Sequence, residues 1–319
     1  MKQFDVFNGD ADGICALQQI RLSNPIKSEL ITGIKRDIQL VKRVNAKKGD
    51  NILVLDISLA KNHKEVKALL EQGCSVQYFD HHMAGTTFTH TNFKNNINTS
   101  AETCSSLLVN KYLNNEFSLW AIVGAYGDNM FTAADALAEK KGLNQIEQAQ
   151  LKELGQFINY NGYGGSLDDL YFHPDALYKL IKPYKNPFNF IKNEPAYNTL
   201  KTGFFSDLKK AEKLTSVQLT DKTAVYLLPN EKWARRVSGT FGNQLANQAP
   251  DRAHALLTSI TGNKYQVSVR APLNNKIGAG TLCSKFETGG GREGAAGINY
   301  LKEQDKEIFL KYFTNQYSH

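Results

Sequence analysis

The stretch Phe4-Asp-Val-Phe-Asn-Gly-Asp-Ala-Asp-Gly13 joins a short apolar run to a turn that carries two aspartates. Glycines on both sides of these aspartates allow a tight turn into a helix predicted over residues 14–22. Asp10 and Asp12 are two positions apart, so on an extended turn both carboxylates point the same way. The pattern predicts a strand whose carboxyl end presents two acidic side chains.

Two later apolar runs end in the same manner. Residues 51–55 (Asn-Ile-Leu-Val-Leu) lead into Asp56, and residues 75–79 lead into the triplet Asp80-His-His82. In an open α/β sheet, ligands bind in the crevice beyond the carboxyl ends of the strands. If these runs are neighbouring parallel strands, we expect their terminal side chains to converge there.

The fold class predicted for the first part of the chain is α/β, a parallel sheet sandwiched by helices. Short continuous apolar runs alternate with helical patterns, as is typical of parallel sheets covered on both faces. Further helices are expected at 104–113, 119–125, 133–141 and 146–157. The Asn/Gly/Tyr-rich segment 159–169 predicts a loop, or a hinge.

We predict three regions: a metal-binding domain over 1–175, a connector over 176–210 that several prolines punctuate, and a smaller α/β domain over 211–319. The last region shows strand-like segments separated by one helical segment. Its predicted elements are strands at 224–228, 254–260 and 265–270 and a helix at 237–248.

Charge divides unevenly along the chain. Residues 1–200 carry 21 basic and 21 acidic side chains, so the net charge of +7 lies entirely in residues 201–319, with 17 basic and 10 acidic ones. This surplus suggests an anionic partner such as phosphate or nucleic acid, the alternative being lysines that keep the surface soluble. No apolar run approaches the roughly 18 residues that a membrane span needs, so we expect no membrane partner.

The four cysteines are isolated, with no paired spacing. Lone thiols in such a chain are typical of small core residues in a reducing compartment. No signal-peptide pattern precedes the first strand. We therefore expect a cytoplasmic protein.

The converging carboxylates need a counter-charge, because several cannot stay ionised side by side without one. Oxygen ligands with one or two imidazoles favour Mn²⁺ or Mg²⁺ over Zn²⁺. Asp128 follows Gly127 after another apolar segment and offers a further carboxylate. For any one aspartate a turn or helix-cap role is the alternative, but the same chemistry at three strand ends favours a metal site.

Four motifs over about 120 residues resemble the DHH phosphoesterase superfamily: Asp10-Ala-Asp12-Gly, Asp56, Asp80-His-His82 and Gly127-Asp128. That superfamily includes RecJ exonucleases, bacterial nanoRNases, cyclic-dinucleotide phosphodiesterases and a class of inorganic pyrophosphatases. The C-terminal part resembles the DHH-associated domain of the nuclease and nanoRNase branches. Its matching stretches are Arg235-Arg236-Val-Ser238-Gly239, the strand ending at Arg270, and residues 289–297.

The resemblance implies one complete ion site and a second, shared one. The ligands of the first ion would be Asp12, Asp56, His81 and Asp128. Asp56 would bridge to a second ion that Asp10 also holds, with Mn²⁺ as the expected metal and Mg²⁺ as the alternative. Asp80 would orient a histidine, and His82 would face the scissile phosphate.

Two departures from the family pattern concern the second ion and the glycine-rich motif. Many members have a histidine ligand four residues before the first aspartate, where this chain has Val6; the carbonyl oxygen of Asn8 is the nearest substitute. Where the family usually has a histidine after the glycines, this chain has Arg292, behind Gly290 and Gly291. An arginine there would bind phosphate bidentately beside glycine N–H groups.

Three more residues are candidate phosphate contacts, with a surface role as the alternative: Arg236, Ser238 and Arg270. The leading functional hypothesis is a metal-dependent phosphodiesterase acting on linear dinucleotides or short oligoribonucleotides. RecJ-type exonucleases usually carry an additional oligonucleotide-binding domain, for which we expect no room here. The alternatives are a phosphomonoesterase acting on 3′-phosphoadenosine 5′-phosphate and a degenerate nucleotide-binding member without turnover. A homodimer is left open.

Overall fold

The computed structural model describes residues 1–100 and 102–318, and the chain divides into two compact units, Met1–Thr202 and Gly203–His319. The division falls within a long helix, so residues 176–202 belong to the first unit. Among the described helices, none combines the length and apolar character required to cross a membrane.

The first unit is built on a parallel sheet of five strands in the order β2-β1-β3-β4-β5. This confirms the predicted parallel α/β fold. The strands are β1 (Gln3–Phe7), β2 (Glu29–Ile31), β3 (Asn51–Leu55), β4 (Ser75–Asp80) and β5 (Phe93–Ile97).

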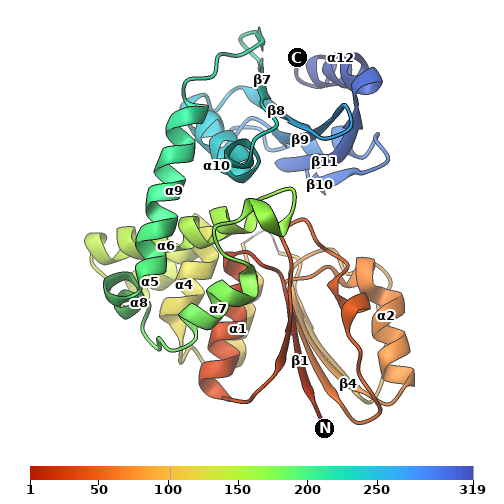
Figure 1. The fold of residues 1–319 in the computed structure, drawn as a ribbon, viewed down its shortest axis with the longest axis vertical. Coiled ribbons are helices and arrows are strands. Elements are labelled where there is room, and N and C mark those ends of the chain that lie inside the picture. Colours follow the sequence, from red (N-terminus) through yellow and green to blue (C-terminus); the bar gives the residue numbers. More distant parts are fainter. Residues whose placement is uncertain (101, 319) are drawn as a thin grey trace. The chain divides into compact units, whose positions relative to one another are not determined.

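Helices cover both faces of this sheet (Figure 1), with α2 on one face and α1, α4 and α6 on the other. The helices of this unit are α1 (Ala11–Ser23), α2 (Leu59–Glu71), α3 (Ser105–Tyr112), α4 (Ser118–Gly127), α5 (Phe131–Lys140), α6 (Gln145–Gly162), α7 (Pro174–Ile181), α8 (Pro187–Asn193) and α9 (Pro195–Ala211), which continues into the second unit. Two 3-10 turns, η1 (Leu40–Arg43) and η2 (Leu167–Asp169), complete it.

The strand order reverses direction at β1. From β1 the chain first adds β2 on one side and then returns to add β3 on the other. Such a switch point opens a crevice at the carboxyl ends of the two central strands, where α/β proteins bind their ligands. The segments that follow β1 and β3 carry Asp10, Asp12 and Asp56.

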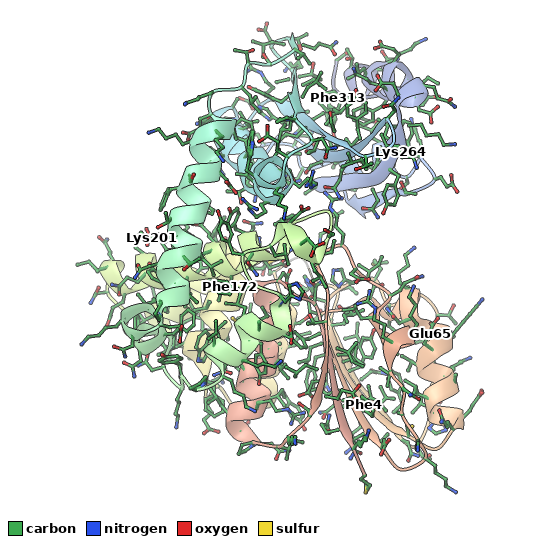
Figure 2. All side chains as sticks on the ribbon, in the orientation of Figure 1. Phe4, Glu65, Phe172, Lys201, Lys264 and Phe313 are labelled. Carbon is green, nitrogen blue, oxygen red and sulfur yellow. The ribbon has the colours of Figure 1, made fainter. Side chains whose placement is uncertain are left out.

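Side chains on the two faces of β1 hold the sheet to the helices that cover it. Phe4 and Val6 are fully buried in the core between the sheet and α2, and Figure 2 shows Phe4 inside the unit. Asp5, on the other face, accepts a 2.8 Å hydrogen bond from Nε of Arg21 in α1. The ion pair fixes α1 against β1, and removing either partner would leave an unpaired buried charge.

The segment expected to form a loop at 159–169 is in part helical, which corrects that prediction. α6 continues to Gly162, and its last turn is buried. Asn161 explains the difference, since its side chain donates to the Phe172 carbonyl and accepts from the Phe172 N–H. Tertiary hydrogen bonds therefore satisfy polar residues whose local composition favours a loop.

The second unit is a six-stranded mixed sheet in the order β10-β11-β9-β8-β7-β6. This agrees with the predicted smaller α/β fold. Its strands are β6 (Gln218–Leu219), β7 (Thr223–Leu228), β8 (Ala253–Ile260), β9 (Lys264–Arg270), β10 (Gly289–Arg292) and β11 (Ala295–Lys302). Its remaining elements are α10 (Lys232–Gln248), α11 (Ala279–Cys283), η3 (Glu303–Asp305) and α12 (Lys306–Tyr317).

Two apolar clusters hold this unit together. One joins α10 to the sheet through Trp233, Phe241 and Leu256. The other packs α11 and α12 against the sheet and includes Phe309 and Phe313, of which Phe313 is seen inside the unit in Figure 2. Each unit therefore has a core of its own.

Candidate metal centre

Asp12 sits in the first turn of α1 and is held by the start of another helix. The N–H groups of Ser105 and Ser106, the first residues of α3, donate to its two carboxylate oxygens at 2.7 Å each. The positive end of a helix stabilises a carboxylate in this position. Asp12 is fully buried, so these bonds fix an anion inside the fold.

His81 lies at the centre of the acidic cluster. Its Nδ1 is 3.0 Å from the Thr103 carbonyl oxygen, which can only accept, so Nδ1 donates this hydrogen bond and Nε2 faces the carboxylates. Nε2 lies 3.4 Å from Asp56 Oδ1, 3.6 Å from Asp128 Oδ2 and 4.0 Å from Asp12 Oδ2. This is the tautomer and orientation that a metal-binding imidazole needs.

Asp56 follows β3 directly and has a strained backbone. Its φ is 58°, in the left-handed region that only a few per cent of non-glycine residues adopt. Burial raises the Asp56 pKa well above its usual value, and the neighbouring carboxylates, first Asp12, raise it further. Strain and electrostatic repulsion at one residue are typical of a functional site.

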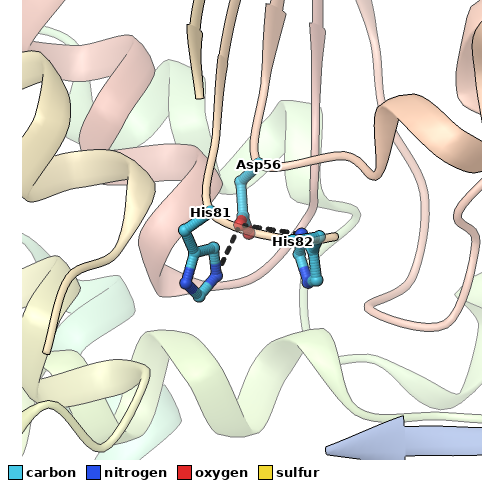
Figure 3. A group of neighbouring side chains, drawn as sticks. All are labelled: Asp56, His81 and His82. Atoms are coloured by element: carbon cyan, nitrogen blue, oxygen red, sulfur yellow. Dashed lines mark ion pairs between the residues drawn. The ribbon is translucent and has the colours of Figure 1, made fainter. Parts of the chain in front are cut away.

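Asp80 orients His82 rather than His81. One oxygen of Asp80 accepts from the backbone N–H of His82 at 3.2 Å and lies 2.7 Å from its Nδ1. The His82 side chain is 38 % exposed, whereas Asp80 is fully buried. Figure 3 shows His81 and His82 on opposite sides of the Asp56 carboxylate.

These groups fit one divalent ion. Ligand atoms of Asp12, His81 and Asp128 lie within 4.8 Å of one another, as do those of Asp56, His81 and His82. Donors bound at about 2.1 Å from an ion are about 3–4 Å apart, so small shifts would close the shell. An ion would also relieve the repulsion that raises the Asp56 pKa.

Asp10 is committed to other partners. Its Oδ1 caps α1 by accepting from the N–H groups of Asp12 and Gly13, at 3.0 and 3.1 Å. Its Oδ2 lies 2.5 Å from Nζ of Lys35. Asp10 therefore caps α1 and also forms an ion pair with Lys35. Its role as a metal ligand stays a prediction.

Lys35 is the residue that the sequence analysis missed. Its ammonium also lies 3.0 Å from Asn159 Oδ1, 3.5 Å from Asp128 Oδ1 and 5.4 Å from the centre of the Tyr163 ring. Burial opposes its charge, but nearby anions, first Asp10, raise the Lys35 pKa well above its usual value. A signal was present, since Lys35 directly follows the apolar run of residues 30–34 at the end of a strand-like segment.

Val6 and Asn8 leave little for a second ion. Val6 is fully buried in the apolar core. The amide of Asn8 donates to the Lys35 carbonyl at 3.4 Å, and Asn8 Oδ1 is buried without a hydrogen-bond partner among the described residues. Asn8 is thus the remaining candidate oxygen ligand near β1.

In the second unit, three predicted phosphate contacts make hydrogen bonds inside the unit. Arg236 binds the Asp207 carboxylate through Nε and Nη2, both at 2.8 Å. Ser238 donates to the Arg235 carbonyl. Nε of Arg270, at the end of β9, donates to Oδ1 of Asn243 in α10 at 2.6 Å. These contacts build α10 into the unit, and the phosphate role stays a prediction.

The glycine-rich motif forms an edge strand. Gly290 and Gly291 lie in β10, which pairs with β11 at the edge of the described sheet. No atom lies within 4 Å of where a Cβ on Gly290 would be, and Arg292 at the end of the strand is exposed. Open space beside the strand and an exposed arginine residue suit an anionic ligand.

Comparison with known proteins identifies the second unit. Residues 220–318 match the family model of the DHHA1 domain. A search of curated sequences finds no match.

Solved structures share the fold of the whole chain. Exonuclease RecJ bound to manganese aligns over 98% of this chain and 89% of its own, with 17% identity and a TM-score of 0.62. RecJ with Mn²⁺ from Thermus thermophilus has the same identity and TM-score, but this chain spans only 51% of it. The pGpG-specific phosphodiesterase PggH of Vibrio cholerae aligns over 99% of this chain and 98% of its own, with 12% identity and a TM-score of 0.55. The DHHA1 match confirms the predicted resemblance of the C-terminal part, and the solved structures confirm the predicted fold.

Proposed function

We propose that the chain is a metal-dependent phosphodiesterase of the DHH superfamily acting on short nucleotide substrates, a proposal supported by the DHHA1 match over residues 220–318 and by the fold shared with RecJ. Linear dinucleotides and oligoribonucleotides a few units long are the proposed substrates. The observation that carries the proposal is the grouping of three carboxylates around Nε2 of His81. RecJ and PggH, which share the fold, are named as an exonuclease and a phosphodiesterase.

Asp12, Asp56, His81 and Asp128 would hold a divalent ion, with Mn²⁺ favoured because the RecJ structures contain it. Such an ion supplies a Lewis acid and a water of lowered pKa for attack on phosphorus. The helix start at α3 fixes Asp12, and the Thr103 carbonyl fixes His81. The protein therefore provides a preorganised, buried ligand set.

His82 would act on the substrate itself. Asp80 fixes the rotation of its ring through Nδ1, and its half-exposed side chain lies beside Asp56. From there it would donate a hydrogen bond or a proton to the scissile phosphate or the leaving oxygen. Asp80 is the positioning residue for this step.

The second unit would bind the phosphate of the substrate. Arg292 with Gly290 and Gly291 is the proposed contact, because there is open space beside Gly290 in the edge strand and Arg292 is an exposed residue. The basic surplus of residues 201–319 supports an anionic ligand.

The test is hydrolysis with Mn²⁺ or Mg²⁺ of a panel: a linear dinucleotide, a five-mer RNA, a cyclic dinucleotide, 3′-phosphoadenosine 5′-phosphate and pyrophosphate. Asp56→Asn is the matched control, because asparagine tolerates the left-handed backbone at this position. We expect metal-dependent cleavage of the dinucleotide or the five-mer, abolished in Asp56→Asn.

Two other outcomes would redirect the proposal. Exclusive turnover of 3′-phosphoadenosine 5′-phosphate would identify a phosphomonoesterase. Wild-type turnover equal to that of Asp56→Asn on every substrate would leave a nucleotide-binding protein without activity.

A further inference from the structure

Lys35 lies in a loop that is packed against the β1–α1 turn. Its N–H donates to the Gly162 carbonyl at 2.8 Å, and its carbonyl accepts from the Asn8 amide. Two residues earlier, the Gly33 carbonyl would be 2.0 Å from a Cβ on Gly9. The backbone on both sides of Lys35 is therefore fixed beside the acidic motif.

The ammonium of Lys35 has the surroundings of a bound cation. Three oxygens from three different elements or turns lie within 3.5 Å of Nζ, and two of them are carboxylate oxygens, of Asp10 and Asp128. The side chain is 22 % exposed. Its charge thus offsets the repulsion among these carboxylates at short range.

The same place is poorly suited to a second divalent ion. The position four residues before Asp10 is Val6, fully buried and apolar. Both oxygens of Asp10 already have partners, the first turn of α1 and Lys35. Directly after β1, Asn8 Oδ1 adds one oxygen without a hydrogen-bond partner among the described residues. An ion bound to Asp10 would have to displace the ammonium.

We propose that the ammonium of Lys35 takes the place of the second cation, so that this chain binds a single divalent ion per active site. Asp12, Asp56, His81 and Asp128 hold that ion, and Lys35 neutralises Asp10. The inference rests on the proposed function, because it presupposes that the acidic cluster binds a divalent ion.

The experiment measures Mn²⁺ stoichiometry by calorimetry and by electron paramagnetic resonance of the full chain. Two ions about 3.5–4 Å apart are magnetically coupled, whereas a single ion gives the spectrum of isolated Mn²⁺. Wild type is compared with Lys35→Met, which keeps the length of the stem and removes the charge. Lys61→Met, an exposed lysine on α2, is the matched control for the loss of one positive charge.

We expect one Mn²⁺ per chain in wild type and in Lys61→Met, with the spectrum of an isolated ion. Lys35→Met should bind a second, weaker ion and show a coupled spectrum, because Asp10 is then unneutralised. If Lys35→Met does not fold, as judged by circular dichroism, Lys35→Gln replaces it with the same expected result.

Two ions in wild type would overturn the inference while leaving the proposed function intact. One ion in the folded charge-removal variant would overturn it as well. Wild type that binds no Mn²⁺ would refute the proposed function and the inference together.

Discussion

At the scale of single residues, the pair Asp80 and His82 shows how a buried charge directs an exposed ring. Asp80 is fully buried, and one of its oxygens receives both the N–H and the Nδ1 of His82. The other oxygen has no hydrogen-bond partner among the described residues. A buried, half-satisfied carboxylate is costly for stability, so its presence here favours a functional reason.

Asp80→Asn should separate orientation from metal binding. The amide keeps the shape but weakens the hydrogen bond that fixes the His82 ring, so we expect kcat to fall about 100-fold. The Mn²⁺ dissociation constant should change only a few-fold, because Asp80 is outside the proposed ligand set. Steady-state kinetics together with Mn²⁺ titration measures both. A loss of metal affinity as large as the loss of kcat would contradict the assigned role.

His254 in β8 links stability to pH. It is 2 % exposed, and burial, then the charge of Arg252, lowers its pKa to about 4. In the unfolded chain a histidine has a pKa of about 6.5. The unfolded state therefore gains a proton first as pH falls, and stability is lost from about pH 6.5 down to about pH 4.

His254→Leu should remove this loss. Wild type is expected to lose about 2 kcal/mol of unfolding free energy from this group between pH 7 and pH 5. Urea denaturation at the two pH values measures it. The variant should show a smaller difference between the two pH values, and an unchanged difference would show that His254 is not responsible.

At the scale of elements, the turn between β1 and α1 must fit closely against the Lys35 loop. A Cβ on Gly9 would lie 2.0 Å from the Gly33 carbonyl oxygen and 2.5 Å from Cγ of Pro174 in α7. Glycine is required here by space, since the surrounding atoms include backbone that cannot move cheaply. The close fit places the Lys35 ammonium against Asp10.

Gly9→Ala should destabilise the first unit by roughly 1–3 kcal/mol, as overpacking does. Gly242→Ala in α10 is the control, because its Cβ would make ordinary contacts, the nearest at 3.5 Å, and alanine favours helices. Thermal unfolding of both variants measures the difference. Equal melting temperatures would mean that the β1–α1 turn is not close-packed.

At the scale of the whole molecule, the chain separates its chemistry between two units. The proposed ion ligands all lie in Met1–Thr202 and the DHHA1 match lies in the other unit. The proposed metal should therefore stabilise the first unit directly, by mass action on its folded form.

Trp120 provides a probe of this effect, since it is fully buried in α4, and Trp233 is the only other tryptophan of the chain. In the Trp233→Phe variant, Mn²⁺ at about 100 times its dissociation constant should add about 2.7 kcal/mol to the free energy of unfolding. Trp120 fluorescence follows this unfolding transition. Adding Asp12→Asn should abolish the gain. A gain that survives this substitution would place the ion elsewhere.

Much of the fold could be predicted because its signals are local. Short apolar runs alternating with helices predicted the parallel sheet, and three strands of the second unit were predicted within one residue of their observed bounds. The helix predicted over 237–248 ends where expected but begins earlier, at Lys232. The last turn of α6 was not, because Asn161 is satisfied by Phe172, eleven residues away. Local composition does not reveal such a partner.

The sequence by itself determined that Asp12 and Asp56 meet, because residues after neighbouring parallel strands converge at one edge of the sheet. Asp128 joins them from the C-terminal end of helix α4. Asp12, Asp56 and Asp128 do gather around His81. Only the tertiary structure decided the charge balance of the site. It brings Lys35 from beyond β2 to Asp10 and Asn159 from α6 to Lys35, and it turns Arg236 toward Asp207. These partners are distant in sequence, and a long cationic side chain is directed by the anions that surround it after folding.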